Sequence, residues 1–192
     1  DASELLKKNP WRYERLFDSA DIIGSLSTEM DKELIQHGCP REKTIRFPLP
    51  VDTEAFQFSP PSGDFSRPIR ILSVCRLVEK KGLKYVLHAL KSLKTDYDIE
   101  YRIAGDCPLR DELNKQVSEN DLDDVVEFLG WQSSEEVAQL MTDSDTFVQA
   151  STTSTDGDKE GTPTVLLEAQ ARGMPVISTW HAGIPEIVDN GS

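Results

Sequence analysis

From residue 69 onward, short apolar segments rich in β-branched residues alternate with amphipathic segments, and this alternation is the feature that most constrains the fold. The expected strands are Ile69–Val74, Ile99–Ala104, Val125–Leu129, Thr146–Gln149 and Val176–Ser178. The expected helices lie between them, at about Leu83–Leu93, Leu109–Ser118, Ser134–Met141 and Thr162–Arg172. Their apolar residues recur at intervals of three and four, as in a helix that buries one face. Strands and helices in this order predict an α/β fold with a doubly wound parallel sheet covered on both faces.

The first 68 residues follow a different pattern. Helices are expected at Asn9–Phe17 and Glu29–His37, and short strands at Asp21–Ser27 and Thr44–Pro48. About 50 residues are too few for an independent α/β domain. We therefore interpret residues 1–50 as the tail of a preceding domain and the proline-rich residues 51–68 as an interdomain linker. Residues 69–192 would form the main domain.

Composition excludes several classes of function. The 192 residues carry a formal net charge of -13, whereas a surface that binds nucleic acid must be basic. No apolar run approaches the roughly 20 residues of a membrane-spanning helix. The three cysteines are widely spaced, which indicates reduced cytoplasmic thiols rather than a disulfide framework or a zinc site. The chain lacks an initial methionine and a signal peptide, so we expect that the start of the protein is missing.

The cations are unevenly distributed. Residues 70–94 contain seven basic side chains and one acidic side chain, whereas residues 96–192 are strongly acidic. Such a cluster at a strand–helix junction could neutralise a small anion. It could equally be the solvated face of a lysine-rich helix, and charge alone does not decide between the two.

The residues that follow each strand are the candidates for binding, because ligands of open α/β sheets lie outside the carboxyl ends of the strands. Arg76 leaves the first strand, and Lys81 with Gly82 opens the next helix. Cations beside the free N–H groups of a helix N-terminus would form a cradle for a pyrophosphate. The plain alternative is less favourable, since basic residues there oppose the helix dipole. The glycine-containing turns after the second and third strands are more often tight turns than sites.

The segment after the fourth strand has the strongest signal. Thr162 is predicted as the N-cap and Pro163 as the first helical residue. Glu168 then lies among apolar residues and should have a fixed partner, which the two hydroxyls of a ribose would match. Glu160 precedes the helix, where a sugar attached to the pyrophosphate would project. The alternatives are a solvated helix residue for Glu168 and an ordinary loop acid for Glu160.

Two other residue types give weaker signals. His181 follows the fifth strand, and a lone histidine in that position is more often structural than catalytic. His37 and His88 lie on helical segments remote from the strand ends. The tryptophans are too scattered to indicate a platform for stacking carbohydrate.

The chain resembles glycosyltransferase family 4 in an ordered set of motifs: CRLVEKKG, AGDCP, FLGW, EGTPTVLLEA and HAGIPEIVDNG. Glu160 and Glu168, with seven residues between them, match the family's pair of glutamates. Members of the exopolysaccharide or colanic-acid type look most similar. The resemblance implies one half of a GT-B fold, with two Rossmann-like domains facing a cleft. The segment from Glu33 to Phe56 looks like the end of the acceptor domain and the hinge.

Roles for the residues follow from the resemblance. It implies that Arg76 and Lys81 hold the donor diphosphate and that Glu168 binds the ribose hydroxyls. Glu160 would contact the donor sugar as the catalytic residue, and the backbone amides of Thr162 and Thr164 would face the sugar or the phosphate. Such enzymes retain the anomeric configuration, and they need no metal ion or other cofactor.

Three features depart from the family pattern. Many members have Gly where this chain has Pro163, so one N–H donor is absent. Ala182-Gly183 stands where a glycine pair is frequent. The acceptor domain, with its glycine-rich loop and any catalytic histidine, would be missing, and the donor domain would be truncated at its C-terminus.

We therefore expect the donor half of a cytoplasmic hexosyltransferase, which moves sugar from a UDP- or GDP-sugar to a glycan or lipid-linked acceptor in polysaccharide biosynthesis. Alone it should bind the donor weakly and not transfer, because half the cleft is absent. Peripheral membrane contact would come through the absent domain. The rivals are a non-catalytic nucleotide-sugar-binding scaffold and a GT-B-like epimerase or phosphorylase. A dinucleotide oxidoreductase fits least, since the first strand lacks a GxGxxG turn.

Overall fold

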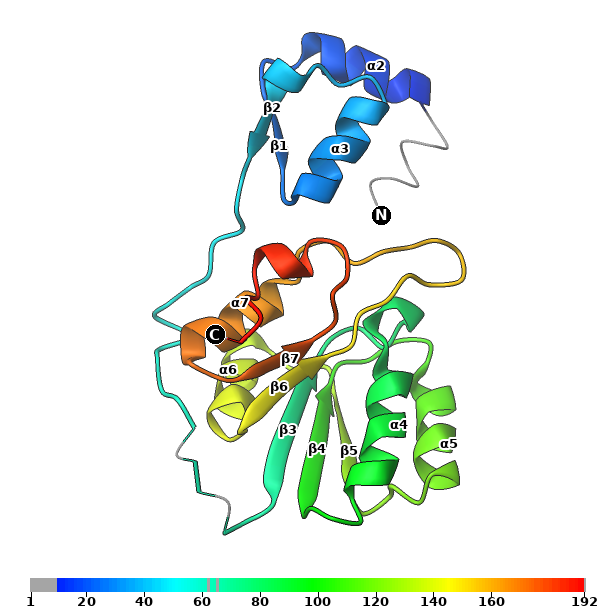
Figure 1. Ribbon diagram of the computed structural model, residues 1–192, viewed down its shortest axis with the longest axis vertical. Helices are drawn as coiled ribbons and strands as arrows, with labels where there is room; N and C mark the ends of the chain where they lie inside the picture. Colours follow the sequence, from blue (N-terminus) through cyan, green and yellow to red (C-terminus); the bar gives the residue numbers. More distant parts are fainter. Residues whose placement is uncertain (1–9, 62, 65, 192) are drawn as a thin grey trace.

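A computed structural model of the chain describes residues 10–61, 63, 64 and 66–191 (Figure 1). Before residue 51, the described residues contain two helices, a short 3-10 helix and a parallel pair of strands. These are α2 (Pro10–Ser19), β1 (Ile23–Ser25), α3 (Thr28–Gln36), η1 (Arg41–Lys43) and β2 (Thr44–Arg46). Phe17, Leu34 and Cys39 form the small core of this first part. The strands β1 and β2 are shorter than the sequence predicts. Asn9, the predicted start of the first helix, lies outside the described residues.

The second part alternates strands and helices as the periodicity predicts. Its elements are β3 (Ile69–Val74), η2 (Glu79–Lys81), α4 (Leu83–Leu93), β4 (Ile99–Ala104), α5 (Arg110–Glu119), β5 (Val126–Gly130), α6 (Ser134–Thr142), β6 (Thr146–Gln149), α7 (Thr164–Arg172), β7 (Val176–Ser178) and η3 (Ile184–Glu186). Four of the five strands have the bounds expected from sequence. The fifth, β5, is shifted by one residue.

The five strands form one parallel sheet in the order β5-β4-β3-β6-β7. Counted within this sheet, the order is 3-2-1-4-5, which is the order of a Rossmann-type sheet. The chain leaves β3 toward β4 on one side and later returns to place β6 on the other side. The point where the order reverses therefore lies between β3 and β6.

Helices cover both faces of this sheet, as the predicted α/β class requires (Figure 1). On one face, α4 and α5 pack over a core that includes Leu87, Tyr101 and Leu113. On the other face, α6 and α7 pack over Leu72, Phe147 and Leu166. Neighbours in one strand point to opposite faces: in β6, Phe147 enters the second core and Val148 the first. This two-sided burial explains why the strands read as nearly continuous apolar runs.

Local signals account for the start of α6. Ser133 is the N-cap, its hydroxyl accepts from the amide of Glu136, and the Glu136 carboxylate accepts from the amide of Ser133. This reciprocal capping box was visible in the sequence as a serine followed three residues later by a glutamate.

Residues 51–61 run along the second part and are attached to it. Phe56 is 4% exposed and belongs to the core beneath α6 and α7. The amide of Ser59 donates to the carbonyl of Arg172 at 2.8 Å. Phe58 lies against Gly173 at the end of α7. This segment therefore contributes side chains to the main core.

Candidate functional site

The residues singled out from the sequence gather where the strand order reverses. Arg76 and Lys81 follow β3, and Glu160 follows β6, so they come from the two strands that flank the reversal. In open α/β sheets this crevice, outside the carboxyl ends of the strands, is where ligands bind.

After β3, the chain makes a short 3-10 helix before α4 begins. Lys81 lies at the end of η2, and Gly82, in the left-handed region at φ 65°, is the N-cap of α4. Lys81 therefore directly precedes the N-cap of α4, one residue outside that helix. A Cβ atom on Gly82 would lie 1.8 Å from the carbonyl oxygen of Ala150, which explains why glycine stands there.

The two lysines of η2 pair with acids of the loop that follows β6. Lys81 forms an ion pair with Glu160, and their side chains are only 12% and 9% exposed. The ammonium of Lys80 lies 2.9 Å from a carboxylate oxygen of Asp158. The β3 and β6 exits are thus joined by two ion pairs. Part of the positive charge counted in the sequence is neutralised by nearby acids.

Arg76 is different, because its side chain is exposed and its guanidinium makes no hydrogen bond or ion pair with another described residue. It lines a pocket of about 410 Å³ at the ends of β3, β4 and β5. Cys75, Gly105 and Trp131 also line this pocket, and Trp131 is 75% exposed. Burial raises the pKa of the Cys75 thiol to about 12, so this cysteine is a neutral wall of the pocket. The arginine offers an unused planar fork of donors at the pocket edge.

Gly105, the glycine of the turn after β4, serves the protein backbone. A Cβ atom there would lie 1.9 Å from the carbonyl oxygen of Cys75, and its φ is +139°. Its amide donates to the carbonyl of Gly130 at 2.7 Å. The sequence favoured a tight turn over a binding site here, and the structure shows a close approach to another segment of the chain.

Gln149 is a polar residue of this site that the sequence analysis missed. It is the last residue of β6 and is 2% exposed. Its side-chain amide nitrogen donates to Ser151 Oγ at 2.9 Å and to a Glu160 oxygen at 3.4 Å. Its Oε1 is buried without a hydrogen-bond partner. A glutamine at the end of an otherwise apolar buried strand was the available signal.

His181 contacts the loop after β6 from the other side. Its Nε2 accepts from the amide of Glu160 at 3.3 Å, which requires that this nitrogen carry no proton. Burial lowers the pKa of His181 and outweighs the opposing effect of the Glu160 charge, so the neutral ring is favoured at neutral pH. The contact is to the backbone, in keeping with the structural role favoured from sequence.

Helix α7 begins later than predicted. Pro163, with ψ 115°, occupies the N-cap position, and Thr164 is the first helical residue. The expected caps were therefore wrong by one residue. The extended ψ of Pro163 keeps it outside the helix, and the hydroxyl of Thr162 donates to the carbonyl of Leu26 at 3.2 Å instead of capping. Thr164 thus presents one of the amides that no helical carbonyl satisfies.

Glu168 lies in the second turn of α7, and its carboxylate makes no hydrogen bond or ion pair with another residue that the structure describes. It is half-buried, and this burial raises the pKa of its carboxyl. A carboxylate that loses hydration without gaining a protein donor is unfavourable. The sequence argument that Glu168 needs a partner therefore has no answer among the residues that the structure describes.

Comparisons with known proteins decide the family. The profile of the family described as glycosyl transferases group 1 matches residues 56–192. The chain belongs to this family. It is 39% identical over 187 residues to WcaL of Escherichia coli (strain K12), a glycosyltransferase named for colanic acid biosynthesis. It is 36% identical over 187 residues to the amylovoran biosynthesis glycosyltransferase AmsK of Erwinia amylovora.

Both matches cover 97% of this chain but only 46% of the relative, so the chain spans about half the length of these proteins. Among solved structures, Anabaena HepE in complex with UDP and glucose superposes with a TM-score of 0.76 at 24% identity. That superposition covers 90% of this chain and 48% of HepE. It confirms the expected half of a GT-B fold.

Two further observations concern metal binding and membrane spans. In the part of the chain that the structure describes, no group of three or more His, Cys, Asp or Glu side chains could hold a metal ion. None of the helices there is long and apolar enough to cross a membrane. What the site does present is two lysines paired with acids of the loop after β6, the unused guanidinium of Arg76, and the half-buried carboxylate of Glu168.

Proposed function

We propose that this group 1 glycosyltransferase chain binds the donor of a sugar transfer, a UDP- or GDP-hexose, at the reversal between β3 and β6. The observation that carries this proposal is the meeting of Lys81 and Glu160 across that point, with the unpaired guanidinium of Arg76 at the end of the same strand, β3. An anion such as a diphosphate would find one free guanidinium and one ammonium that can be shared with Glu160.

Each part of the donor has a matching group. Arg76 and Lys81 would hold the diphosphate. The flat base would enter the pocket beside Trp131, where an exposed aromatic face and apolar walls are available. The half-buried, unpartnered carboxylate of Glu168 would accept hydrogen bonds from both ribose hydroxyls. The free amide of Thr164 and the backbone of Thr162 would face the sugar or the phosphate.

The chemistry follows from this placement. The bond between the sugar's anomeric carbon and the diphosphate oxygen breaks, and its electron pair remains on the diphosphate. Arg76 and Lys81 would stabilise the charge that grows there, which is the largest contribution that preorganised cations can make. The acceptor hydroxyl forms the new bond to the anomeric carbon and gives its proton to an oxygen of the departing diphosphate. Glu160 would orient the sugar, so that the new bond forms with retention of the anomeric configuration and without a metal ion or other cofactor.

The acceptor and the biological setting are proposed from the relatives. Proteins named for colanic acid and amylovoran biosynthesis suggest a growing glycan or a lipid-linked acceptor in the cytoplasm. We also propose that the 192 residues alone bind the donor without efficient transfer, because positioning both reactants supplies much of catalysis.

Calorimetry with a panel of UDP- and GDP-sugars tests the proposal. Lys81→Ala and Glu168→Ala should each weaken binding of the preferred donor by about 10- to 100-fold, the range for hydrogen bonds to charged groups. Lys91→Ala, on the exposed face of α4, is the matched control and should leave affinity unchanged. If no nucleotide sugar binds, or if the two site variants bind as tightly as the control, the site assignment is wrong.

A further inference from the structure

Three segments that are distant in sequence pack together, and one of them is the loop that carries Glu160. They are the turn at residues 25–29 before and at the start of α3, the loop at 159–162, and the segment 181–186 that ends in η3. Gly183 lies where they meet. A Cβ atom there would lie 3.0 Å from Gly161 O, from Ser27 Cβ and from Thr162 Oγ1. The three segments are therefore packed against one another without spare room.

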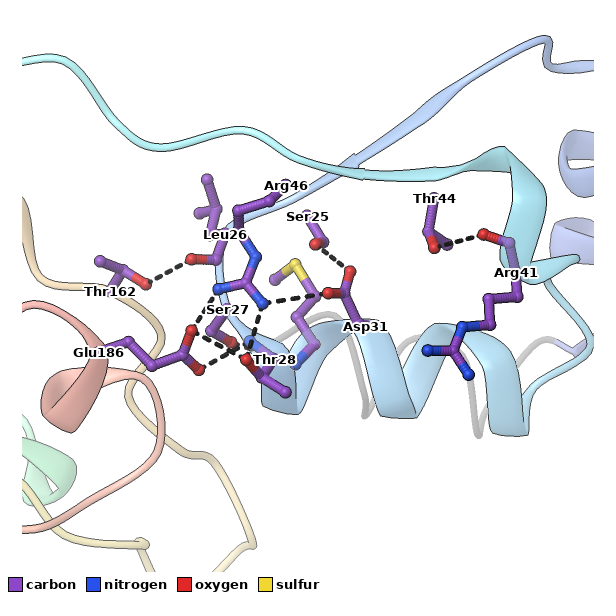
Figure 2. A network of polar contacts seen from close by, with 11 residues as sticks. Ser25, Leu26, Ser27, Thr28, Asp31, Arg41, Thr44, Arg46, Thr162 and Glu186 are labelled. Carbon is purple, nitrogen blue, oxygen red and sulfur yellow. Dashed lines mark hydrogen bonds and ion pairs between the residues drawn. The ribbon is translucent and has the colours of Figure 1, made fainter.

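Four polar side chains tie this junction together (Figure 2). We name the set Thr28, Asp31, Arg46 and Glu186 the clamp. Arg46 forms an ion pair with Glu186, and its other terminal nitrogen lies 2.8 Å from Thr28 Oγ1 and 3.1 Å from an oxygen of Asp31. The amide and hydroxyl of Thr28 donate to Glu186 at 2.7 and 3.1 Å. One carboxylate from η3 thus receives donors from both α3 and β2.

The position of Glu186 at the N-terminus of α3 makes the contact favourable. Thr28 is the first residue of α3, and its amide has no partner within the helix. A carboxylate there also interacts with the positive end of the helix dipole. Burial alone would raise the pKa of Glu186, but the hydrogen bonds from Arg46 and Thr28 hold the pKa below its usual value.

The same turn holds the Glu160 loop directly. Thr162 Oγ1 donates to the carbonyl of Leu26, and the ammonium of Lys159 lies 3.1 Å from a carboxylate oxygen of Glu29. Residues 150–163 contain neither helix nor strand. A carboxylate on such a long irregular segment depends on neighbouring segments for its position, and small displacements of a reacting group cost rate.

We propose that Arg46 and Glu186 are positioning residues for Glu160, acting by holding the 25–29 turn against the 159–162 loop. Neither is among the residues proposed to hold the donor. This proposal rests on the proposed function in one respect, because it assumes that Glu160 contacts the donor sugar. It adds that residues on β2 and η3, outside the donor site, determine how well the sugar is recognised.

Hydrogen exchange tests the structural half of the proposal without any ligand. In Glu186→Ala, the amides of residues 159–162 should exchange about fivefold faster, as expected from losing a charge network worth somewhat more than a single surface pair. Arg46→Ala should do the same, and Arg46→Lys should partly restore protection. Exchange in α5 should not change. The control Glu135→Gln alters an exposed acid of α6 and should leave both regions as in the wild type. Unchanged exchange at 159–162 in Glu186→Ala overturns the clamp.

Ligand binding tests the positioning half. The affinity of Glu186→Ala for the nucleotide sugar should fall about fivefold, while its affinity for plain UDP or GDP should stay within about twofold, because only the sugar depends on Glu160. An equal loss for both ligands means that the clamp acts on overall structure and overturns the positioning role. If the wild type binds neither ligand, the proposed function fails and the positioning role fails with it. The exchange result stands independently in that case and still decides whether the clamp holds the loop.

Discussion

The ion pair between Lys81 and Glu160 makes a quantitative prediction about stability. Both side chains are about nine-tenths buried, and Lys81 has no other hydrogen-bond acceptor among the described residues. Glu160 keeps two neutral donors, from Gln149 at 3.4 Å and from the amide of Gly161 at 3.3 Å. Removing one member of such a pair leaves the other charge buried without its counter-ion, whereas removing both does not.

The magnitudes follow from what each substitution leaves behind. Lys81→Met retains the volume of the side chain but leaves a buried carboxylate with weak neutral donors, so it should lower the free energy of unfolding by about 3 kcal/mol. Glu160→Gln keeps an oxygen that can accept from Lys81 and should cost about 1.5 kcal/mol. The double variant should lie only about 2 kcal/mol below the wild type, because neither charge is then left alone.

Urea unfolding, followed by tryptophan fluorescence and circular dichroism at 25 °C, measures all three variants. The control is Lys91→Met, because Lys91 is an exposed residue of α4. This variant should change the free energy of unfolding by less than about 0.5 kcal/mol. If the loss in the double variant equals the sum of the two single losses, the side chains do not interact. The joining of the β3 and β6 exits by this pair would then be wrong.

Three further predictions concern single positions. Burial would raise the pKa of Asp145, but hydrogen bonds from Arg67 and neighbouring groups outweigh it and lower the pKa to about 2. The contribution of this carboxylate to the free energy of unfolding should be complete above about pH 4 and lost as the pH falls toward 2. Asp145→Asn should lower the free energy of unfolding by about 2 kcal/mol in urea at pH 7 and make stability less dependent on pH in that acid range. Because burial raises the pKa of Glu168, its charge destabilises the free protein at neutral pH. Glu168→Gln should therefore raise the urea midpoint of unfolding at pH 7. This gain over the wild type should vanish as the pH falls through the pKa of Glu168, where the wild-type carboxyl also becomes neutral. Gly105→Ala should lower the free energy of unfolding by about 3 kcal/mol or prevent folding, because the φ of Gly105 is +139° and the carbonyl of Cys75 blocks a Cβ atom there. Gly161→Ala is the matched control: a Cβ atom there meets open space, so thermal unfolding should be nearly unchanged.

The fold was accessible from sequence where the determining forces are local. The strands Ile69–Val74 and Ile99–Ala104 were predicted with their observed bounds, because strands buried on both faces need uninterrupted apolar, β-branched residues. The capping box at Ser133 was equally local. The N-cap of α7 was misplaced by one residue because Pro163 is compatible with either the N-cap or the first turn, and Thr162 instead bonds to the distant carbonyl of Leu26.

The candidate site was only partly accessible, because its contacts join distant parts of the chain. The residue types Arg76, Lys81 and Glu160 could be selected from their places after strands. Their pairing could not, since Lys81 and Glu160 are separated by 79 positions and meet only once the sheet has formed. The same holds for Arg46 and Glu186, which are 140 positions apart. No local pattern marks such contacts, and they depend on the strand order of the whole sheet.

A crystal structure of this chain with a bound UDP- or GDP-sugar tests the central claim most directly. The account predicts the diphosphate within roughly 3 Å of both the Arg76 guanidinium and the Lys81 ammonium, the usual range for charge-assisted hydrogen bonds. It also predicts the ribose hydroxyls on the Glu168 carboxylate. A nucleotide sugar bound elsewhere, with the Lys81–Glu160 pair undisturbed and Glu168 still without a partner, would contradict it.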